Sequence, residues 1–199
     1  MKKIFVLLCS LLLVLALPGT AAAYSYTIVK GDTLWKIAVR TQTGLSELIA
    51  YNPHIANPAL IYPGDVITVP EKDTTAQSYA QEVLRLVNAQ RTANGLSALV
   101  LNWELSRVAQ YKAQDMRDNQ YFSHTSPTYG TPFNMMQSFG IRYSYAAENI
   151  AQGYASPAAV VEGWMNSAGH RANILNSHYT TMGVGYASPG SYWSQMFTG

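Results

Sequence analysis

The chain is divided into two unlike parts by a short polar stretch, "EKDTT" (residues 71–75), that shows no apolar periodicity. Such a polar stretch is typical of a linker between two modules. We therefore predict a first module over 24–70, a linker over 71–78 and a second module over 79–199. As a flexible chain, five linker residues span only about 12 Å, which keeps the modules close together.

The N-terminus has the layout of a secretory signal peptide. Two lysines precede an apolar run over residues 4–17, and three alanines follow at 21–23. The apolar run is shorter than the roughly 20 residues of a membrane-spanning helix. We predict that residues 1–23 are a signal peptide and that the mature protein is exported. The only cysteine, Cys9, lies in this segment, so the mature chain would depend on core burial without disulfides.

The charge balance says little in favour of an anionic partner. The formal net charge of the chain is +2, and removal of the two N-terminal lysines leaves as many basic as acidic residues. A mature charge near zero offers no electrostatic attraction to nucleic acid or to an anionic membrane. We therefore expect neither as a partner after signal cleavage.

The first module has the pattern strand, helix, helix, strand. Alternation predicts a strand over 26–28, after which Asp32 or Thr33 can cap a helix. A second helix is predicted from Ser46 to an Asn-Pro pair, and a returning strand over 66–69 follows the turn "YPGD". The first module is therefore predicted to be a small βααβ unit.

Three stretches of this module, "YTIVKGDTLWKIA", "LSELIAYNP" and "IYPGDVITVP", resemble the LysM domain, which binds N-acetylglucosamine-containing glycans of peptidoglycan and chitin. "NPHIANPALIYPGD" is most similar to the LysM modules of spore-coat assembly proteins. The resemblance implies a shallow groove between the loop after the first strand and the loop before the last. In this chain the groove residues would be Gly31, Asp32, Thr33, Leu34, Leu60, Ile61 and Pro63. An alternative is that Leu34 and Ile61 simply belong to the core.

The second module mixes helices and strands. Apolar residues at helical spacing run from Ala80 to a stop at Asn94-Gly95, and Asn102 can cap a longer helix. Two capping residues followed by proline, at 131–132 and 156–157, predict two further helix starts. The tail over 182–199 alternates on both sides of a Ser-Pro-Gly turn, as in a β-hairpin. These elements predict one layered α+β domain.

This module resembles the CAP superfamily, which groups cysteine-rich secretory proteins, antigen 5 and plant pathogenesis-related proteins. The motifs that carry the resemblance are "LVNAQRTANGLSALVLNWELSRVAQYKAQDM", "YFSHTSP", "AAENIAQGY", "VVEGWMNSAGHRANILNSHYTTMGVGYA" and "YWSQMF". The resemblance implies a three-layer α-β-α sandwich with an open cavity lined by two histidines and two glutamates.

Three of the four family cavity positions have a match in this chain. His124 of "FSH", Glu148 of "AENI" and His170 of "AGHR" correspond to the two histidines and the first glutamate. The position of the second glutamate is Ser167 here. Glu162 lies nearby, but five residues along a helix is about 140° around its axis, so the second acid stays open between these two positions.

These residue types allow two kinds of chemistry. Two imidazoles and a carboxylate can hold a divalent metal such as zinc, which would make His124, His170 and Glu148 its ligands. Without metal, Glu148 could orient a histidine for acid–base work near neutral pH.

We predict an exported protein that LysM attaches to peptidoglycan in the cell wall or spore envelope, with a CAP cavity that binds a ligand or metal. A wall-associated hydrolase or peptidase and a structural spore-coat protein are the alternatives, and the sequence leaves enzymatic activity undecided. No serine or cysteine nucleophile is placed by motif beside the histidines, which favours binding.

Overall fold

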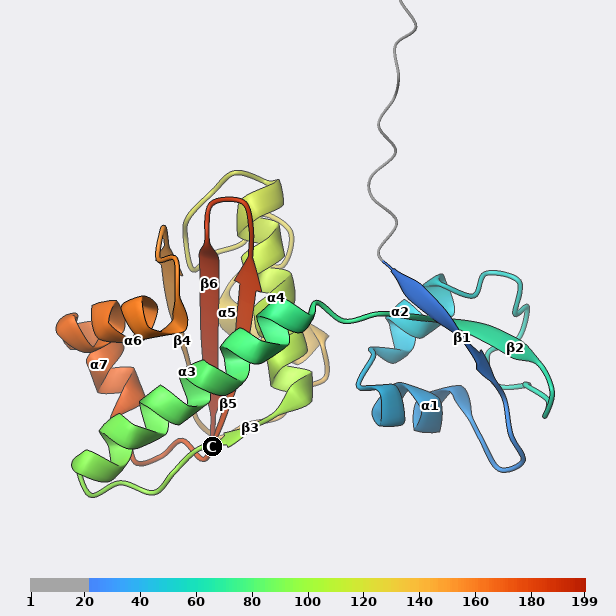
Figure 1. Cartoon of the computed structure of the whole chain (residues 1–199), viewed down its shortest axis with the longest axis horizontal. Helices are drawn as coiled ribbons and strands as arrows, with labels where there is room; N and C mark the ends of the chain where they lie inside the picture. The colour runs from blue at the N-terminus through green and yellow to red at the C-terminus, as the bar shows by residue number, and fades with distance from the viewer. Residues whose placement is uncertain (1–21) are drawn as a thin grey trace, which may run out of the picture.

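The computed structural model describes residues 22–199, which form two domains joined by a short connector (Figure 1). The predicted signal peptide lies outside the described residues except for its last two positions. None of the helices within residues 22–199 is both long and apolar enough to cross a membrane.

The first domain has the predicted order of elements. They are β1 (Ala23–Thr27), α1 (Leu34–Thr41), α2 (Leu45–Ala50) and β2 (Val66–Pro70). The two strands pair antiparallel, with Tyr24 opposite Val69. A core of apolar side chains from all parts of the domain fills the space between strands and helices: Ile28, Leu34, Ile37, Ala38, Leu48, Ile67 and Val69.

Local hydrogen bonds explain where these elements begin and how they join. The Thr33 hydroxyl accepts a hydrogen bond from the Lys36 amide, which caps α1 as predicted. The buried Asn52 side chain bonds both the Leu48 carbonyl and the backbone of Thr68, at 2.7 Å in each case. This amide fastens α2 to β2 and closes the domain.

The second domain is a three-layer α-β-α sandwich, as predicted. Its elements are α3 (Thr74–Ala93), β3 (Val100–Leu101), α4 (Trp103–Asp118), α5 (Pro132–Ser138), β4 (Ala146–Gln152), α6 (Pro157–Asn166), α7 (Ala168–Ile174), β5 (Thr181–Ala187) and β6 (Tyr192–Thr198). The sheet order is β3-β5-β6-β4; β3 runs parallel to β5 and the other pairs are antiparallel. The predicted C-terminal hairpin is the β5–β6 pair.

Separate apolar cores cover the two faces of the sheet. On one face, side chains from α3, α6 and α7 pack around the buried Trp164 and Trp193. On the other, α4 and α5 contribute Leu105, Met135 and neighbouring residues, which pack against Met196 of β6. Because β4 is an edge strand of the sheet, side chains from the helices and loops on both faces of the sheet can lie close together beside it.

Helix α4 lies unusually close to β5 because two strand positions are glycine. A Cβ atom added to Gly183 would come within 2.3 Å of the Leu105 carbonyl carbon, and one added to Gly185 within 2.2 Å of the same atom of Ala109. Such distances leave no room for any side chain. The two glycines therefore set the distance between helix and sheet.

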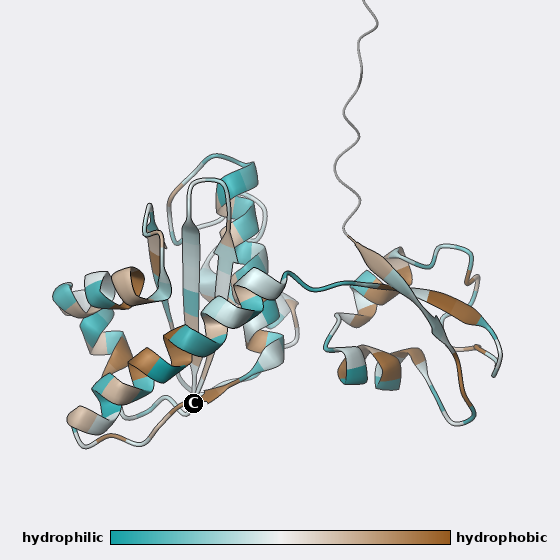
Figure 2. Cartoon of the chain, viewed as in Figure 1, coloured by the Kyte–Doolittle hydropathy of each residue, from teal (hydrophilic) through white to brown (hydrophobic). Residues whose placement is uncertain are grey.

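The predicted linker is shorter than expected. Helix α3 already begins at Thr74, because the Asp73 carboxylate caps it by accepting a hydrogen bond from the Ala76 amide at 3.0 Å. Only residues 71–73 are irregular, and this connector is hydrophilic (Figure 2). The expected linker over 71–78 is corrected accordingly.

Candidate functional site

The second domain places a buried carboxylate at the edge of its sheet. Glu148 lies in β4 opposite Met196 of β6, and its side chain is only 1% exposed. The Ser194 hydroxyl donates a hydrogen bond to one carboxylate oxygen at 3.4 Å. Since a buried charge needs a partner, the second oxygen of Glu148 must find one nearby.

That partner is His124. Its Nδ1 atom lies 2.7 Å from Oε2 of Glu148, while 53% of its side chain is exposed. The histidine follows α4 in an irregular segment and reaches the carboxylate from the solvent side. A buried acid thus orients an exposed imidazole and leaves the other ring nitrogen free to face a ligand.

His170 comes to the same place from α7. Its backbone carbonyl accepts a hydrogen bond from the Asn149 side chain at 3.2 Å, which fastens α7 to β4. Burial lowers the pKa of His170 below its ordinary value of 6.5, and the nearby charge of His124 lowers it further. His124 and Glu148 are therefore in direct contact, and His170 lies close enough for the charge of His124 to affect it.

Lys112 supports this site, and the sequence analysis missed it. Its fully buried ammonium group donates hydrogen bonds to the Ser123 carbonyl at 2.7 Å, the His124 carbonyl at 3.0 Å and the Tyr121 hydroxyl at 3.0 Å. Burial lowers the pKa of Lys112, and the negative charge of Glu148 counteracts this effect. A lysine on the apolar stripe of a helix was the signal that could have identified it.

Asp115, one turn further along α4, is a second supporting residue that the sequence analysis missed. Its carboxylate accepts hydrogen bonds from four side chains: Asn119, Tyr121, Ser126 and Thr128. Burial alone would raise the pKa of Asp115, but these hydrogen bonds outweigh it and the pKa is lowered. Lys112 thus holds the backbone at His124, and Asp115 holds side chains on both sides of it.

The two candidates for the second acid, Glu162 and Ser167, lie next to each other at the end of α6. Glu162 is exposed on α6, and Ser167 lies at the junction of α6 and α7. Both line a different hollow of about 380 Å³, together with Tyr154. Neither His124 nor His170 lines this hollow, so whether Glu162 or Ser167 completes the cavity stays a prediction.

The imidazole nitrogens and the carboxylate of this site are suitable ligand types for a divalent metal, but they are not arranged as a metal site. Within residues 22–199, no three histidine, cysteine, aspartate or glutamate side chains gather closely enough to hold a metal ion. One nitrogen of His124 is already engaged by Glu148. Zinc binding by His124, His170 and Glu148 therefore stays a prediction, and no chemical step is assigned to a metal.

In the first domain, the two predicted glycan-binding loops lie side by side. The Gly64 amide donates a hydrogen bond to the Ile28 carbonyl at 2.9 Å, which ties the loop before β2 to the end of β1. Asp32 stabilises its own loop by accepting hydrogen bonds from Tyr26 and Arg40, and these bonds lower its pKa to about 2. Its carboxylate is thus already engaged within the protein.

The predicted glycan-binding residues differ in exposure. Leu34 is a core residue, as the alternative interpretation held, and Ile61 packs partly against the same core. Leu60 is exposed, and so are Gly31 and Pro63. Two further aromatic side chains, Trp35 and Tyr62, are each 57% exposed near these loops; the sequence analysis missed both.

Comparisons with known proteins agree with this two-part structure. Residues 26–70 match the LysM domain, and residues 84–198 match the cysteine-rich secretory protein family. The uncharacterized protein YkwD of Bacillus subtilis is 50% identical over 132 residues, which cover 66% of this chain and 51% of that protein. A probable autolysin of Staphylococcus aureus is 39% identical over 61 residues, or 31% of this chain and 21% of that protein.

A solved structure supports the same assignment. An extracellular protein with an SCP domain from Bacillus anthracis has a TM-score of 0.60 and 32% sequence identity, covering 68% of this chain and 47% of that chain. The chain spans about half the length of this protein and of YkwD. Because the family match takes in more than half of its residues and the three-layer fold agrees, the chain belongs to the cysteine-rich secretory protein (CAP) family and carries a LysM domain ahead of the CAP domain.

Proposed function

We propose that this is an extracellular, cell-wall-associated protein whose LysM domain attaches it to N-acetylglucosamine-containing glycans. The LysM match and the similarity to a probable autolysin support this proposal. So does the position of the two loops, which lie beside each other on the part of the domain away from the CAP domain (Figure 1).

For the CAP domain we propose ligand binding at the His124–Glu148 pair. The observation that carries this proposal is the contrast in exposure between the partners, 53% for the His124 side chain and 1% for that of Glu148. The carboxylate holds the imidazole in one orientation, so the second ring nitrogen is presented to solvent as a fixed hydrogen-bonding group. The nearby His170 is half-buried, and its lowered pKa favours the neutral imidazole, which can also hydrogen-bond a ligand.

Hydrolysis of wall material is the second candidate, and the same pair favours it. A carboxylate that orients a histidine can direct the free ring nitrogen at a water molecule, from which it could take a proton. However, in the described part of the chain no hydroxyl or thiol side chain hydrogen-bonds to His124 as a nucleophile would. Binding without covalent chemistry is therefore the better supported function.

Sedimentation with purified peptidoglycan tests the role of LysM. We expect the full chain to co-sediment and added salt to change this little, because residues 24–70 hold as many basic as acidic side chains. Leu60→Asp should reduce sedimentation at least tenfold, whereas Val100→Asp, also at an exposed apolar position but in the CAP domain, should not. Equal sedimentation of both variants would contradict the assignment.

The second assay separates binding from hydrolysis. Purified peptidoglycan incubated with the full chain should release no soluble fragments above the buffer background. Release that disappears in His124→Asn would replace ligand binding by hydrolysis as the function of the site. The same variant should fold normally, because the His124 side chain is largely exposed.

A further inference from the structure

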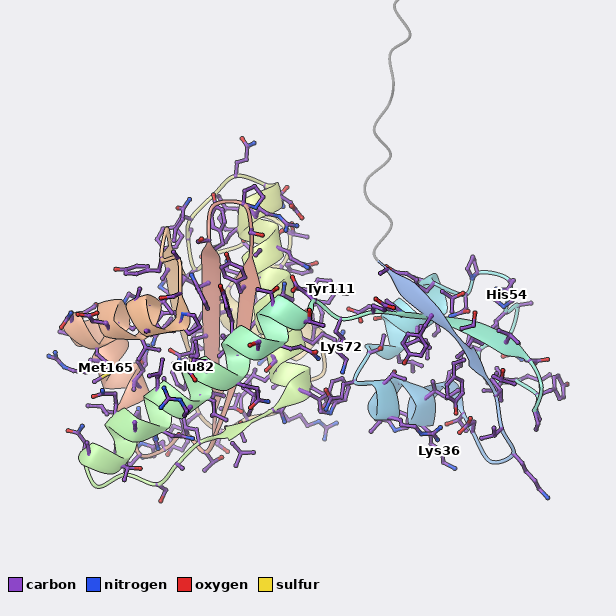
Figure 3. All side chains as sticks on the ribbon, viewed as in Figure 1. Lys36, His54, Lys72, Glu82, Tyr111 and Met165 are labelled. Atoms are coloured by element: carbon purple, nitrogen blue, oxygen red, sulfur yellow. The ribbon has the colours of Figure 1, made fainter. Side chains whose placement is uncertain are left out.

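A cleft of about 730 Å³ separates the LysM and CAP domains. Its walls are the segment from Gln42 to Tyr51 of LysM, the connector, the first turns of α3 and one side of α4. Figure 3 shows Lys72 of the connector and Tyr111 of α4 at this joint. None of the predicted LysM glycan-binding residues lines the cleft, so it is separate from their groove. Its volume lies in the usual range of ligand pockets, about 300–1,000 Å³.

Contacts between the domains hold the cleft open at a defined width. Arg107 of α4 pairs with Glu47 of α2 at 3.8 Å, and both side chains are mostly buried, at 17% and 23% exposure. Gly44 packs against the same guanidinium group so closely that an added Cβ would come within 2.3 Å of it. Across the connector, Lys72 donates a hydrogen bond to Gln42 at 2.9 Å. The Arg107 guanidinium thus has a charge partner in Glu47, although its buried Nε atom has no hydrogen-bond partner among the described residues.

Several neutral polar groups that line the cleft are left without a hydrogen-bond partner within residues 22–199. Among the described residues, no hydrogen bond engages the indole N–H of Trp103, the hydroxyls of Tyr51 and Tyr111, or the amides of Gln77 and Gln114, all of which line it. Aromatic rings combine an apolar face with a polar edge, and glutamine amides both donate and accept hydrogen bonds. A pyranose ring has the matching surface, with apolar C–H faces and a rim of hydroxyl and acetamido groups.

We propose that this cleft is a second glycan-binding site, which takes a short, uncharged, N-acetylated segment of the same wall glycans that LysM binds. The choice of a wall glycan as the ligand rests on the proposed wall association, whereas the existence of a binding site is inferred from the residues that line the cleft. Three acidic and two basic side chains line the cleft, so an anionic peptide or a nucleic acid would find no net positive charge here.

Two sites on one chain change how the protein holds a polymer. Once LysM is bound, the cleft meets neighbouring glycan segments at a high effective concentration, which can strengthen attachment by about 10²–10⁴. The connector is only three residues long, so the two sites move together.

The test is a calorimetric titration of the full chain with chitotetraose, the tetramer of N-acetylglucosamine. We expect two molecules bound per chain. Gln77→Ala/Gln114→Ala should weaken one site at least tenfold, and Leu60→Asp should weaken the other. The control Gln90→Ala/Gln137→Ala removes two exposed glutamines of α3 and α5 that do not line the cleft, so both sites should stay unchanged. Circular dichroism should show all variants folded.

The outcomes distinguish the two proposals. If the parent binds one molecule and only Leu60→Asp removes it, the cleft proposal is overturned and the LysM proposal stands. If Leu60→Asp changes nothing while the Gln77/Gln114 variant loses a site, the cleft is supported and the predicted LysM groove is refuted. Binding of a peptidoglycan stem peptide in the cleft, without binding of chitotetraose there, overturns the glycan assignment.

Discussion

Replacement of Lys112 by methionine should destabilise the CAP domain and loosen the segment that carries His124. The substitution keeps the length of the buried stem but removes three hydrogen bonds from its ammonium group. Hydrogen bonds to a charged group contribute about 1.5–3 kcal/mol each, but Ser123 and His124 are exposed enough for water to replace part of their loss. Glu148 also loses a neighbouring positive charge.

We therefore expect a loss of about 2–4 kcal/mol in the free energy of unfolding. In a domain of this size such a loss lowers Tm by on the order of 10 °C. Urea denaturation followed by tryptophan fluorescence measures it, since Trp164 and Trp193 are buried in this domain. The His124 ring proton resonances should also broaden or shift, which would show that the segment has become mobile.

A matched control is Arg85→Met, which removes an exposed ion pair from α3 of the same domain. Surface pairs contribute little, so its effect should stay within about 0.5 kcal/mol. If Lys112→Met is equally harmless and leaves the His124 resonances unchanged, the buried ammonium does not hold the segment and its proposed supporting role is refuted.

Packing and charge in the CAP domain lead to three further expectations. Gly185→Ala should lower the free energy of unfolding by about 2–3 kcal/mol, because the added methyl group would collide with the α4 backbone. Gly169→Ala has open space around it and should raise the free energy of unfolding by about 0.5–1 kcal/mol. Chemical denaturation measures both. Because the pKa of His170 is lowered in the folded state, the unfolded chain takes up a proton at a higher pH than the folded chain does. The Tm of the parent should therefore fall relative to that of His170→Asn as the pH decreases through 6.5. If the difference in Tm between the two proteins is the same at about pH 7.5 and about pH 5.5, this expectation is refuted. Calorimetric titration with zinc should show weaker binding in His124→Ala and in His170→Ala but not in His178→Ala, and parent-like affinity of His170→Ala would contradict the metal prediction.

The LysM fold was predictable because local chemistry marks nearly every boundary. The cap at Thr33, the Asn-Pro pair after α2 and the turn before β2 are all read directly from short sequence signals. The sequence predicts too long a connector because Asp73 has the polar character of a linker residue, although it is the cap of α3. A capping aspartate and a linker aspartate look alike until the helix behind them is known.

The CAP site was predictable only in part. Strand β4 carries Glu148 and Asn149 as buried polar residues, so its sequence lacks the alternation that reveals a strand. The resemblance to the CAP superfamily identified His124, Glu148 and His170, but not their supports on α4. Long-range pairing of β4 with β6 creates the buried position of Glu148, and no local pattern contains that information.

Helix α4 contacts both the LysM domain and the segment of His124, through two residues that lie about one and a half turns apart and point in different directions. Arg107 contacts the LysM domain, Lys112 holds the segment of His124, and the helix backbone at Leu105 and Ala109 packs against the two glycines of β5. Few sequences can satisfy all three demands at once. In a saturation-mutagenesis experiment, α4 and the glycines of β5 should therefore stand out as the least substitutable part of the chain, and losses at the joint and at the site should arise from the same positions.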